Sequence, residues 1–219
     1  ERPMTYSVKA GRLLRDGKPV PYKASPNIGG TLKPEYLVMH YTADDRAAGA
    51  IAWLCDPRAK ASAHLVIDQA GAVTQLVPLD RVAWHAGVSK WAGRSGCNNF
   101  TIGVELVNAG PLNKRGDGKY ATALGGTVVP ASSVVIAAHK NGGPERAWQS
   151  YPPAQIAAAM EVARAIVATY GLKDVIGHED IAPARKTDPG PAFPMASFRA
   201  RVMGRAADKP PSAKAGKAA

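Results

Sequence analysis

The stretch Gly177-His178-Glu179-Asp180-Ile181-Ala182-Pro183-Ala184-Arg185-Lys186-Thr187-Asp188-Pro189-Gly190-Pro191 decides how the rest of the chain is interpreted. It holds one imidazole, three carboxylates and two cations, interrupted by three prolines and two glycines. Proline lacks the backbone N–H donor and blocks the preceding helical turn, so this run is neither a regular helix nor an interior strand. The sequence predicts a rigid loop that carries the side chains of an active site.

The segments on either side of this loop show regular patterns. Residues 175–177 form a short apolar run that predicts a strand delivering His178. Residues 36–40 are a continuous apolar run ending in His40, which is typical of a buried central strand. Apolar residues recur at helical spacing over 153–170, after two prolines and before Gly171, so this segment is predicted to be a helix.

Other segments complete a set of alternating strands and helices. Residues 63–67 and 73–77 flank a turn containing Gly71 and predict a hairpin. Residues 100–107 predict a strand inside the sheet, whereas 47–54 and 193–205 predict short helices. This order indicates an α/β fold with a mixed central β-sheet flanked by helices.

The chain is expected to form a single domain with extensions at both ends. Residues 1–33 predict an irregular N-terminal arm with room for a short hairpin, and residues 34–205 are predicted to form the domain. Residues 108–149 predict a large surface loop, with one short apolar element at 134–138. Residues 206–219 have too little apolar surface to fold, so a disordered basic tail is expected.

Composition narrows the classes of partner. The 219 residues carry a formal net charge of +11, which favours polyanionic partners such as nucleic acid, anionic lipid or acidic cell-wall polymer. No apolar run is long enough to predict a transmembrane segment. The chain begins at Glu1, so a removed leader is compatible with it. Cys55 and Cys97 form no close pair, and a disulfide and two buried thiols remain open alternatives.

Three separated residues have the chemistry of metal ligands. His40 and His178 each follow an apolar strand, and Asp188 lies on a loop stiffened by Pro189 and Pro191. Neighbouring strands bring such side chains to one sheet edge, and a catalytic metal site uses three protein ligands of these types. The spacing alone is not specific. A hydrogen-bonded structural histidine, or an aspartate that only shapes a turn, remains an alternative for each position.

Five separated motifs carry a resemblance to a known family. The chain resembles the zinc-dependent N-acetylmuramoyl-L-alanine amidases of the AmpD type, which share a fold with peptidoglycan-recognition proteins. The resemblance covers about residues 35–198. The motifs are Val38-Met39-His40-Tyr41-Thr42, Ser62-Ala63-His64, Ala83-Trp84-His85-Ala86-Gly87, Cys97-Asn98-Asn99-Phe100-Thr101-Ile102-Gly103-Val104-Glu105-Leu106 and the opening stretch, residues 177–191.

The resemblance implies a zinc site and two catalytic residues. The Zn²⁺ ligands would be His40, His178 and Asp188. Glu105 would take a proton from water and pass it to the leaving amine, and its apolar strand would raise its pKa. Lys186 would stabilise the negative charge that develops on the oxyanion. From the residues alone, an outward-facing strand position remains open for Glu105 and a solvated loop position for Lys186.

The same resemblance assigns four residues to the substrate groove: His64, Trp84, His85 and Asn98. Core packing remains an alternative for Trp84, and a structural hydrogen bond for His64. Asp180 is expected to brace the loop. His139 has no motif around it and is expected at the surface.

These observations predict an enzyme that hydrolyses the amide bond between N-acetylmuramic acid, or its anhydro form, and the L-alanine of a peptidoglycan stem peptide. The alternative is a non-catalytic peptidoglycan-binding module on the same fold, although binding-only relatives lose a zinc ligand. A nucleic-acid binder is disfavoured because no nucleic-acid motif is present. The expected partners are therefore peptidoglycan or muropeptides. A periplasmic or exported location is expected from the basic charge, with a cytoplasmic one as the alternative.

Overall fold

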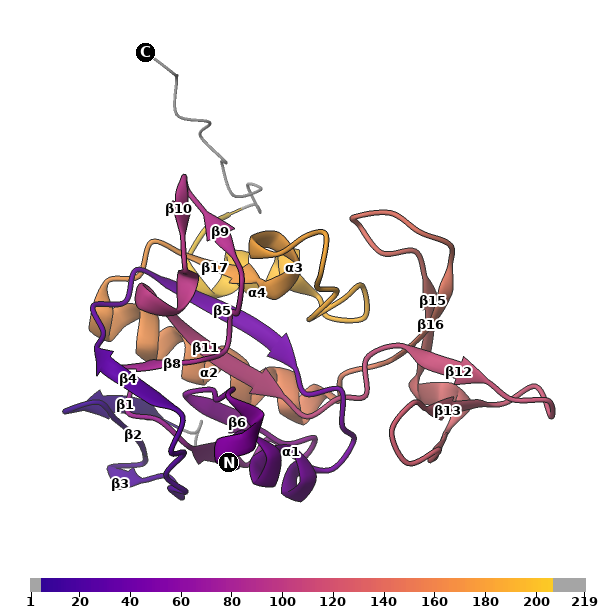
Figure 1. The fold of residues 1–219 in the computed structure, drawn as a ribbon, viewed down its shortest axis with the longest axis horizontal. Coiled ribbons are helices and arrows are strands. Elements are labelled where there is room, and N and C mark those ends of the chain that lie inside the picture. The colour runs from indigo at the N-terminus through magenta and orange to yellow at the C-terminus, as the bar shows by residue number, and fades with distance from the viewer. Residues whose placement is uncertain (1–4, 207–219) are drawn as a thin grey trace, which may run out of the picture.

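A five-stranded mixed sheet lies at the centre of the protein (Figure 1). The computed structural model describes residues 5–206. The strand order is β17-β5-β11-β6-β7, in which only β7 runs antiparallel to its neighbour. The strands are β5 (Tyr36–Tyr41), β6 (Leu65–Ile67), β7 (Val73–Gln75), β11 (Thr101–Leu106) and β17 (Asp174–Gly177). The predicted mixed α/β fold, the hairpin and the interior position of β11 are confirmed.

The two faces of this sheet differ in what they carry. Successive side chains of a strand point to opposite faces. Met39 and Leu106 therefore belong to the main hydrophobic core, while Val38 belongs to a separate cluster. His40 and Glu105 are directly paired in the parallel register of β5 and β11. Both lie on the face opposite the main core, which leaves this face free for chemistry.

Helices flank both faces of the sheet. They are α1 (Ala47–Leu54), α2 (Pro153–Tyr170), α3 (His178–Ile181) and α4 (Met195–Val202). The helices α2 and α4 pack on the main-core face, while α1 and α3 pack with the clusters on the other face. The long helix α2 begins after Pro152 and ends at Gly171, whose φ of 63° is the left-handed conformation that favours glycine. The helices predicted at 47–54 and 153–170 are confirmed, and α4 occupies part of the helical segment predicted at 193–205.

The described part of the N-terminal segment is regular and packed, in contrast to the expected irregular arm. It contains β1 (Tyr6–Lys9), β2 (Arg12–Arg15) and β3 (Lys18–Pro19), which form a meander, and β4 (Ile28–Thr31), which pairs with β8 (Arg81–Ala83). Leu13 is fully buried in the main core. The buried side chain of Gln75 accepts from the Leu13 N–H and donates to the Gly11 carbonyl. These contacts join the meander to the central sheet.

Residues 109–149, called the extension below, form small sheets in place of the expected large surface loop. A three-stranded sheet contains β12 (Leu112–Lys114), β13 (Tyr120–Thr122) and β14 (Val128–Val129). A hairpin contains β15 (Val134–Ala137) and β16 (Arg146–Gln149). β15 coincides with the apolar element predicted at 134–138. Figure 1 shows the extension projecting from the body of the protein.

Several smaller features complete the description. A second short hairpin pairs β9 (Lys90–Trp91) with β10 (Arg94–Ser95). Cys55 and Cys97 are both free thiols. Within residues 5–206, none of the helices combines the length and apolar composition that a membrane crossing requires. The predicted basic tail lies almost entirely outside the described residues.

Candidate metal centre and active site

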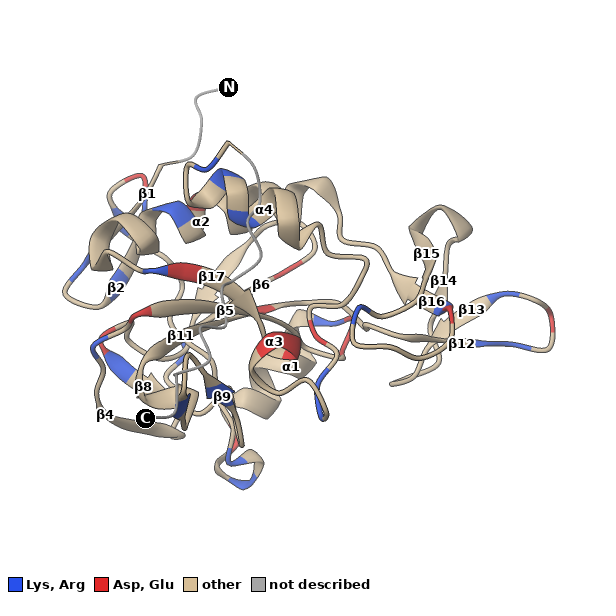
Figure 2. Ribbon diagram, turned by 90° about the horizontal axis from the view of Figure 1, so that it is seen from above, with Lys and Arg blue, Asp and Glu red and all other residues tan. Residues whose placement is uncertain are grey.

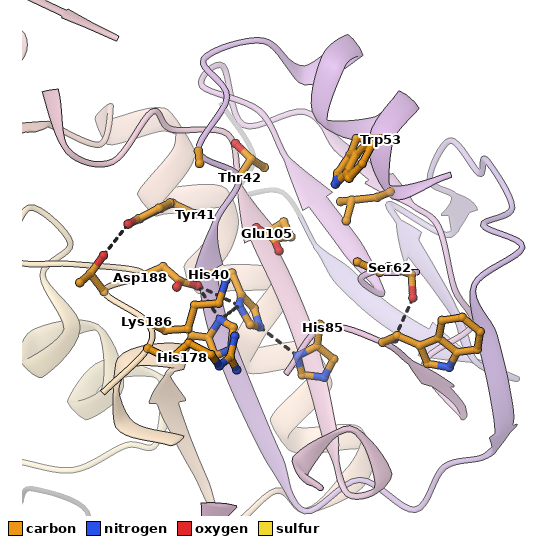
Figure 3. Close-up of a pocket in the computed structure, with 16 residues that line it drawn as sticks. His40, Tyr41, Thr42, Trp53, Ser62, His85, Glu105, His178, Lys186 and Asp188 are labelled. Carbon is orange, nitrogen blue, oxygen red and sulfur yellow. Dashed lines mark hydrogen bonds and ion pairs between the residues drawn. The ribbon is translucent and has the colours of Figure 1, made fainter. Parts of the chain in front are cut away.

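Three side chains from distant parts of the sequence converge at one edge of the sheet (Figure 3). His40 lies near the end of β5, His178 begins α3 directly after β17, and Asp188 follows on the loop. The His40 and His178 Nδ1 atoms lie 3.0 Å apart, and the Asp188 Oδ2 atom lies 2.9 Å and 3.0 Å from them. All three residues are buried. The structure thus brings together the three ligands that the sequence predicted.

Protons alone do not satisfy this triangle of atoms. An ionised Asp188 accepts from a protonated Nδ1, so hydrogen bonds from both histidines would make two N–H groups face each other. At most two of the three contacts are therefore hydrogen bonds. A small cation held at about 2 Å by nitrogen and oxygen ligands keeps those ligand atoms about 3 Å apart. The residues fit a metal ion, which would satisfy all three contacts at once.

Neighbouring groups hold the two imidazoles in the protonation state that a metal ligand needs. His178 Nε2 lies 3.0 Å from the Ala86 carbonyl, which only accepts, so this nitrogen carries the proton. His40 Nε2 lies 2.9 Å from His85 Nδ1, and His85 Nε2 lies 3.3 Å from the Thr101 carbonyl. Protons on these Nε2 atoms satisfy every contact and leave both ligand Nδ1 atoms as lone pairs.

The electrostatics of the site agree with this assignment. Burial lowers the pKa of His40 to about 4, and the nearby His178 acts in the same direction. Burial acts to raise the pKa of Asp188, but the close contacts with the His178 and His40 side chains outweigh it and hold the pKa below its ordinary value. The protein therefore supplies a neutral imidazole at His40 and an ionised carboxylate at Asp188, as metal binding requires.

Glu105 lies beside this triad with one oxygen unsatisfied. Its Oε2 atom is buried and has no hydrogen-bond partner among the described residues. Burial raises the pKa of Glu105 well above its ordinary value; Asp188 adds to this increase, while Lys186 opposes it. A buried carboxylate without a partner is costly, and such groups concentrate where chemistry is performed.

An open cleft of about 400 Å³ gives access to the triad. Trp53 and Trp84 retain 58% and 37% of their surface exposed, so both offer an indole to a bound molecule. In Figure 3, Trp53 lies across the cleft from the metal ligands. The lining residues are His40, Tyr41, Thr42, Ala43, Trp53, Leu54, Ala61, Ser62, Trp84, His85, Glu105, His178, Arg185, Lys186, Thr187 and Asp188.

The four residues that the sequence assigned to the substrate groove divide into two pairs. Trp84 and His85 line the cleft. His64 does not: it is fully buried, with Nε2 2.9 Å from the Arg81 carbonyl and Nδ1 accepting from the Gly103 N–H. Asn98 does not line the cleft either. Its Oδ1 accepts from the backbone N–H groups of His85 and Ala86, so His64 and Asn98 act as internal supports.

A glycine makes room for His85 beneath the central strand. A side chain at Gly103 would place its Cβ 2.4 Å from the His85 Cγ atom, which no rotamer relieves. Only glycine at this position of β11 lets the His85 ring lie against the strand and contact His40. Glycine at position 103 is therefore required for steric reasons, in the same motif that supplies Glu105.

Sequence reasoning missed several functional positions. Trp53, Tyr41, Thr42, Arg185 and Thr187 all line the cleft. The Tyr41 hydroxyl lies 2.7 Å from the Thr187 hydroxyl, and Arg185 donates to the carbonyls of Ala86 and Val88. Tyr41 and Thr42 directly follow His40, and Arg185 and Thr187 flank Lys186, so adjacency to predicted site residues was the available signal.

The structure confirms the expectation for Asp180 and contradicts the one for His139. Asp180 braces the loop as expected, because its Oδ2 accepts from the Gly177 N–H at 2.7 Å. The surface position expected for His139 is wrong. This histidine is only 9% exposed, and its Nε2 lies 2.6 Å from Glu179 Oε2.

A mixed α/β domain with a buried imidazole–imidazole–carboxylate triad, a neighbouring buried carboxylate and an open cleft has the arrangement of the mononuclear metallohydrolases. The sequence profile of the N-acetylmuramoyl-L-alanine amidase family (Amidase_2) matches residues 30–191. The chain belongs to this family.

Individual relatives agree with this membership. The chain is 37% identical over 145 residues to the 1,6-anhydro-N-acetylmuramyl-L-alanine amidase AmpD of Escherichia coli K12, covering 65% of this chain and 59% of that protein. It is 34% identical over 177 residues to the N-acetylmuramoyl-L-alanine amidase AmiD of the same strain, covering 77% and 53%. The chain thus spans little more than half the length of these relatives.

A solved structure of a relative shows a similar fold. It is the complex of E. coli AmiD with the substrate anhydro-N-acetylmuramic acid-L-Ala-D-gamma-Glu-L-Lys. The match has a TM-score of 0.55 and 32% sequence identity, and it covers 89% of this chain and 63% of that chain.

Proposed function

We propose that this chain hydrolyses the amide bond between N-acetylmuramic acid, or its anhydro form, and the L-alanine of a peptidoglycan stem peptide. The observation that carries the proposal is the convergence of His40, His178 and Asp188 within about 3 Å of one another, on the sheet face that also presents Glu105. Family membership and the muropeptide bound to AmiD support this choice of substrate.

We further propose that the metal is Zn²⁺. Two imidazole nitrogens and one carboxylate oxygen are a ligand set that zinc favours in catalytic sites, where a fourth position stays open. When bound, zinc would polarise a water molecule and the scissile carbonyl. The cleft beside the triad leaves space for both, because Glu105, Lys186 and Thr187 line it together with the ligands.

Glu105 would act as the general base and then as the general acid. Its ionised form would accept a proton from the attacking water, and the protonated carboxyl would hand that proton to the leaving amine of L-alanine. Burial raises the pKa of Glu105 towards the range in which both forms are accessible. Glu105 lines the same cleft as the ligands, so its carboxyl group would be within reach of the attacking water and the leaving amine.

Lys186 and the tryptophans would act on the substrate directly. Lys186 lines the cleft two residues before Asp188, where its ammonium would stabilise negative charge on the oxygen of the tetrahedral intermediate. Trp84 and Trp53 would offer apolar faces to a sugar ring, and His85 would contribute a polar edge. A non-catalytic binding module is disfavoured, because all three ligands, the base and the lysine are present.

The net charge of +11 supports a proposal on location and substrate form. A strongly basic chain is suited to contact with anionic cell-wall polymer, which favours a periplasmic or exported protein. Parallel assays on intact sacculi and on soluble anhydromuropeptides test this directly. Faster turnover of sacculi supports the proposal, and turnover of the soluble fragments alone contradicts it.

The zinc-dependent reaction is tested by assaying purified muropeptides before chelation, after chelation and after zinc is restored. We expect turnover to be lost on complete metal removal and to return with zinc. His178→Ala should lose both bound zinc and turnover, by at least about a thousandfold, because a catalytic ligand is missing. Undiminished turnover of the fully stripped protein would overturn the proposal, and full activity with zinc retained in His178→Ala would overturn the ligand assignment.

A further inference from the structure

The β15–β16 hairpin of the extension contacts residues 177–191, the loop that carries His178 and Asp188 and is called the metal loop below. Residues 139–141 follow β15 and contact α3, whose two acidic residues are red in Figure 2. His139 Nε2 lies 2.6 Å from Glu179 Oε2, and Lys140 Nζ lies 2.9 Å from Glu179 Oε1. The Asn141 side-chain amide donates to the Glu179 carbonyl at 3.0 Å. Glu179 therefore contacts three consecutive residues of the hairpin.

Glu179 also joins the two ends of the loop that carries the ligands. It directly follows His178 in the sequence, and its backbone N–H donates to the Asp188 carbonyl at 2.8 Å. Its Oε2 atom accepts from the Gly190 N–H at 3.2 Å. The residue is 3% exposed, so these bonds are shielded from water. Movement of Glu179 would consequently displace both His178 and Asp188.

Lys140 extends the same contact to the neighbouring carboxylate. Its Nζ lies 2.6 Å from Asp180 Oδ1, while Asp180 Oδ2 accepts from the Gly177 N–H. Burial acts to lower the pKa of Lys140, but the hydrogen bonds to Asp180 and Glu179 outweigh it and raise the pKa. The lysine therefore stays charged between two carboxylates that flank the first turn of α3.

Two further contacts place the extension against the loop. A side chain at Gly190 would come within 3.1 Å of the Trp148 ring, which belongs to β16, so the loop passes directly against this indole. Just after the extension, the Tyr151 hydroxyl donates to the Pro189 carbonyl at 2.7 Å. Residues from or next to the hairpin thus contact the part of the metal loop that directly follows Asp188.

We propose that Glu179 is a positioning residue for the metal centre, and that His139 and Lys140 of the extension hold it in place. It is not one of the three ligands and does not line the cleft, but it would set the spacing of His178 and Asp188 and hence the affinity for the ion. Partners that orient metal ligands from outside typically affect metal affinity by about 10–100-fold. The inference rests on the proposed zinc centre.

The experiment measures zinc affinity of the metal-stripped full chain by competition with a chelator of known affinity, alongside muropeptide turnover. Glu179→Gln removes the charge while keeping the shape, and we expect about tenfold weaker zinc binding. Lys140→Met should weaken binding by about threefold. Its side chain is 46% exposed, so this variant is expected to fold even if Glu179→Gln does not.

Matched variants separate positioning from general effects on the extension. Glu145→Gln and Lys119→Met change the same residue types within the extension at exposed sites, and each should keep zinc affinity within about twofold of the wild type. Lys140→Arg keeps the cation and should restore most of the affinity that Lys140→Met loses, a rescue that a purely steric role would not predict.

The outcomes distinguish the two proposals. If the wild type binds zinc and turns over muropeptides while Lys140→Met and Glu179→Gln keep wild-type affinity, the positioning role is overturned and the proposed function stands. If the wild type itself binds no zinc, both the positioning role and the proposed zinc-dependent function are contradicted. Weakened affinity in the two variants, with both controls unchanged and rescue by Lys140→Arg, supports the positioning role.

Discussion

The central sheet and the extension build structure in opposite ways. In the sheet, β5 and β11 pair over six positions and bury Ile102 and Leu106 completely. In the extension, strands of two to four residues leave large apolar side chains in water: Leu124, Val128 and Ile136 are 51%, 43% and 52% exposed. The sheet is fixed by long-range pairing and a shared core, whereas the extension relies on short local pairings.

This difference explains where the chemistry lies. The proposed base and the proposed ligand beside it need a rigid backbone, and the parallel register supplies one by placing Glu105 directly opposite His40. The extension contacts the loop that carries two of the ligands from outside the cleft, through His139 and Lys140 against α3 and through Trp148 against Gly190. The pairing of β5 with β11 therefore fixes the positions of His40 and Glu105. The extension contacts Glu179, which follows the ligand His178.

The largest expected effect comes from the central sheet. Glu105→Gln keeps the shape of the side chain but removes the proton acceptor, so we expect muropeptide turnover to fall by about 10²–10⁴-fold while zinc stays bound. In the wild type, turnover should fall as the pH drops through the raised pKa of Glu105, because the base must be ionised. Turnover and zinc content of the purified variant check this. Loss of zinc together with turnover would assign Glu105 to the metal centre instead.

The same substitution should stabilise the metal-free chain at neutral pH. Folding raises the pKa of Glu105, so the folded chain binds this proton more tightly than the unfolded chain. The resulting stability is present below the unfolded-state pKa and is lost as the pH rises through the folded-state pKa. Glu105→Gln avoids that loss, by about 1–3 kcal/mol for a buried unpaired group. Denaturant unfolding across pH measures it, with the exposed Glu145→Gln as control.

A matched pair of isoleucines tests the comparison through stability. Ile102 in β11 is fully buried, and Ile136 in β15 is 52% exposed. We expect Ile102→Ala to lower the free energy of unfolding by about 2–5 kcal/mol, because a cavity remains in the core. Ile136→Ala should change it by less than about 0.5 kcal/mol. Denaturant melts of both variants provide the measurement, and equal losses would show that the extension shares the stability of the sheet.

The difference in burial between the central sheet and the extension also determined which elements could be predicted from the sequence. Long apolar runs and a capped helix predicted β5, β11 and α2, because burial on this scale leaves a periodic pattern. The short strands of the extension leave no such pattern, and glycines such as Gly125 and Gly126 made the segment resemble a loop. The N-terminal meander was missed for a similar reason, since its packing depends on the distant Gln75.

The candidate site shows a comparable division. His40, His178, Asp188 and Glu105 were predicted because they lie in recognisable motifs, and the structure brings them together. His64 takes the structural hydrogen-bonding role that the sequence left open as an alternative, and the surface position predicted for His139 is wrong. Each is fixed by a partner far away in the sequence, at Gly103 and Glu179. Sequence motifs identified the candidate reacting residues, but the groups that hold them depend on contacts that only the fold creates.

The smallest expected effect concerns the charge of the extension. Lys114 at the end of β12 and Lys119 just before β13 are both exposed, and Lys119 lies beside the aliphatic surface formed by Val128 and Ile136. Replacing both with methionine should raise the KM for intact sacculi by no more than about threefold at low salt, because exposed charges attract an anionic polymer only weakly and over a short range. At about 1 M salt the Debye length shrinks to about 3 Å, and the difference should vanish. The KM for a soluble anhydromuropeptide serves as the internal control, since none of the residues that line the cleft belongs to the extension. A loss that persists at high salt would mean that the extension binds the polymer through its aliphatic surface, and would make it a second substrate-binding region beside the central sheet.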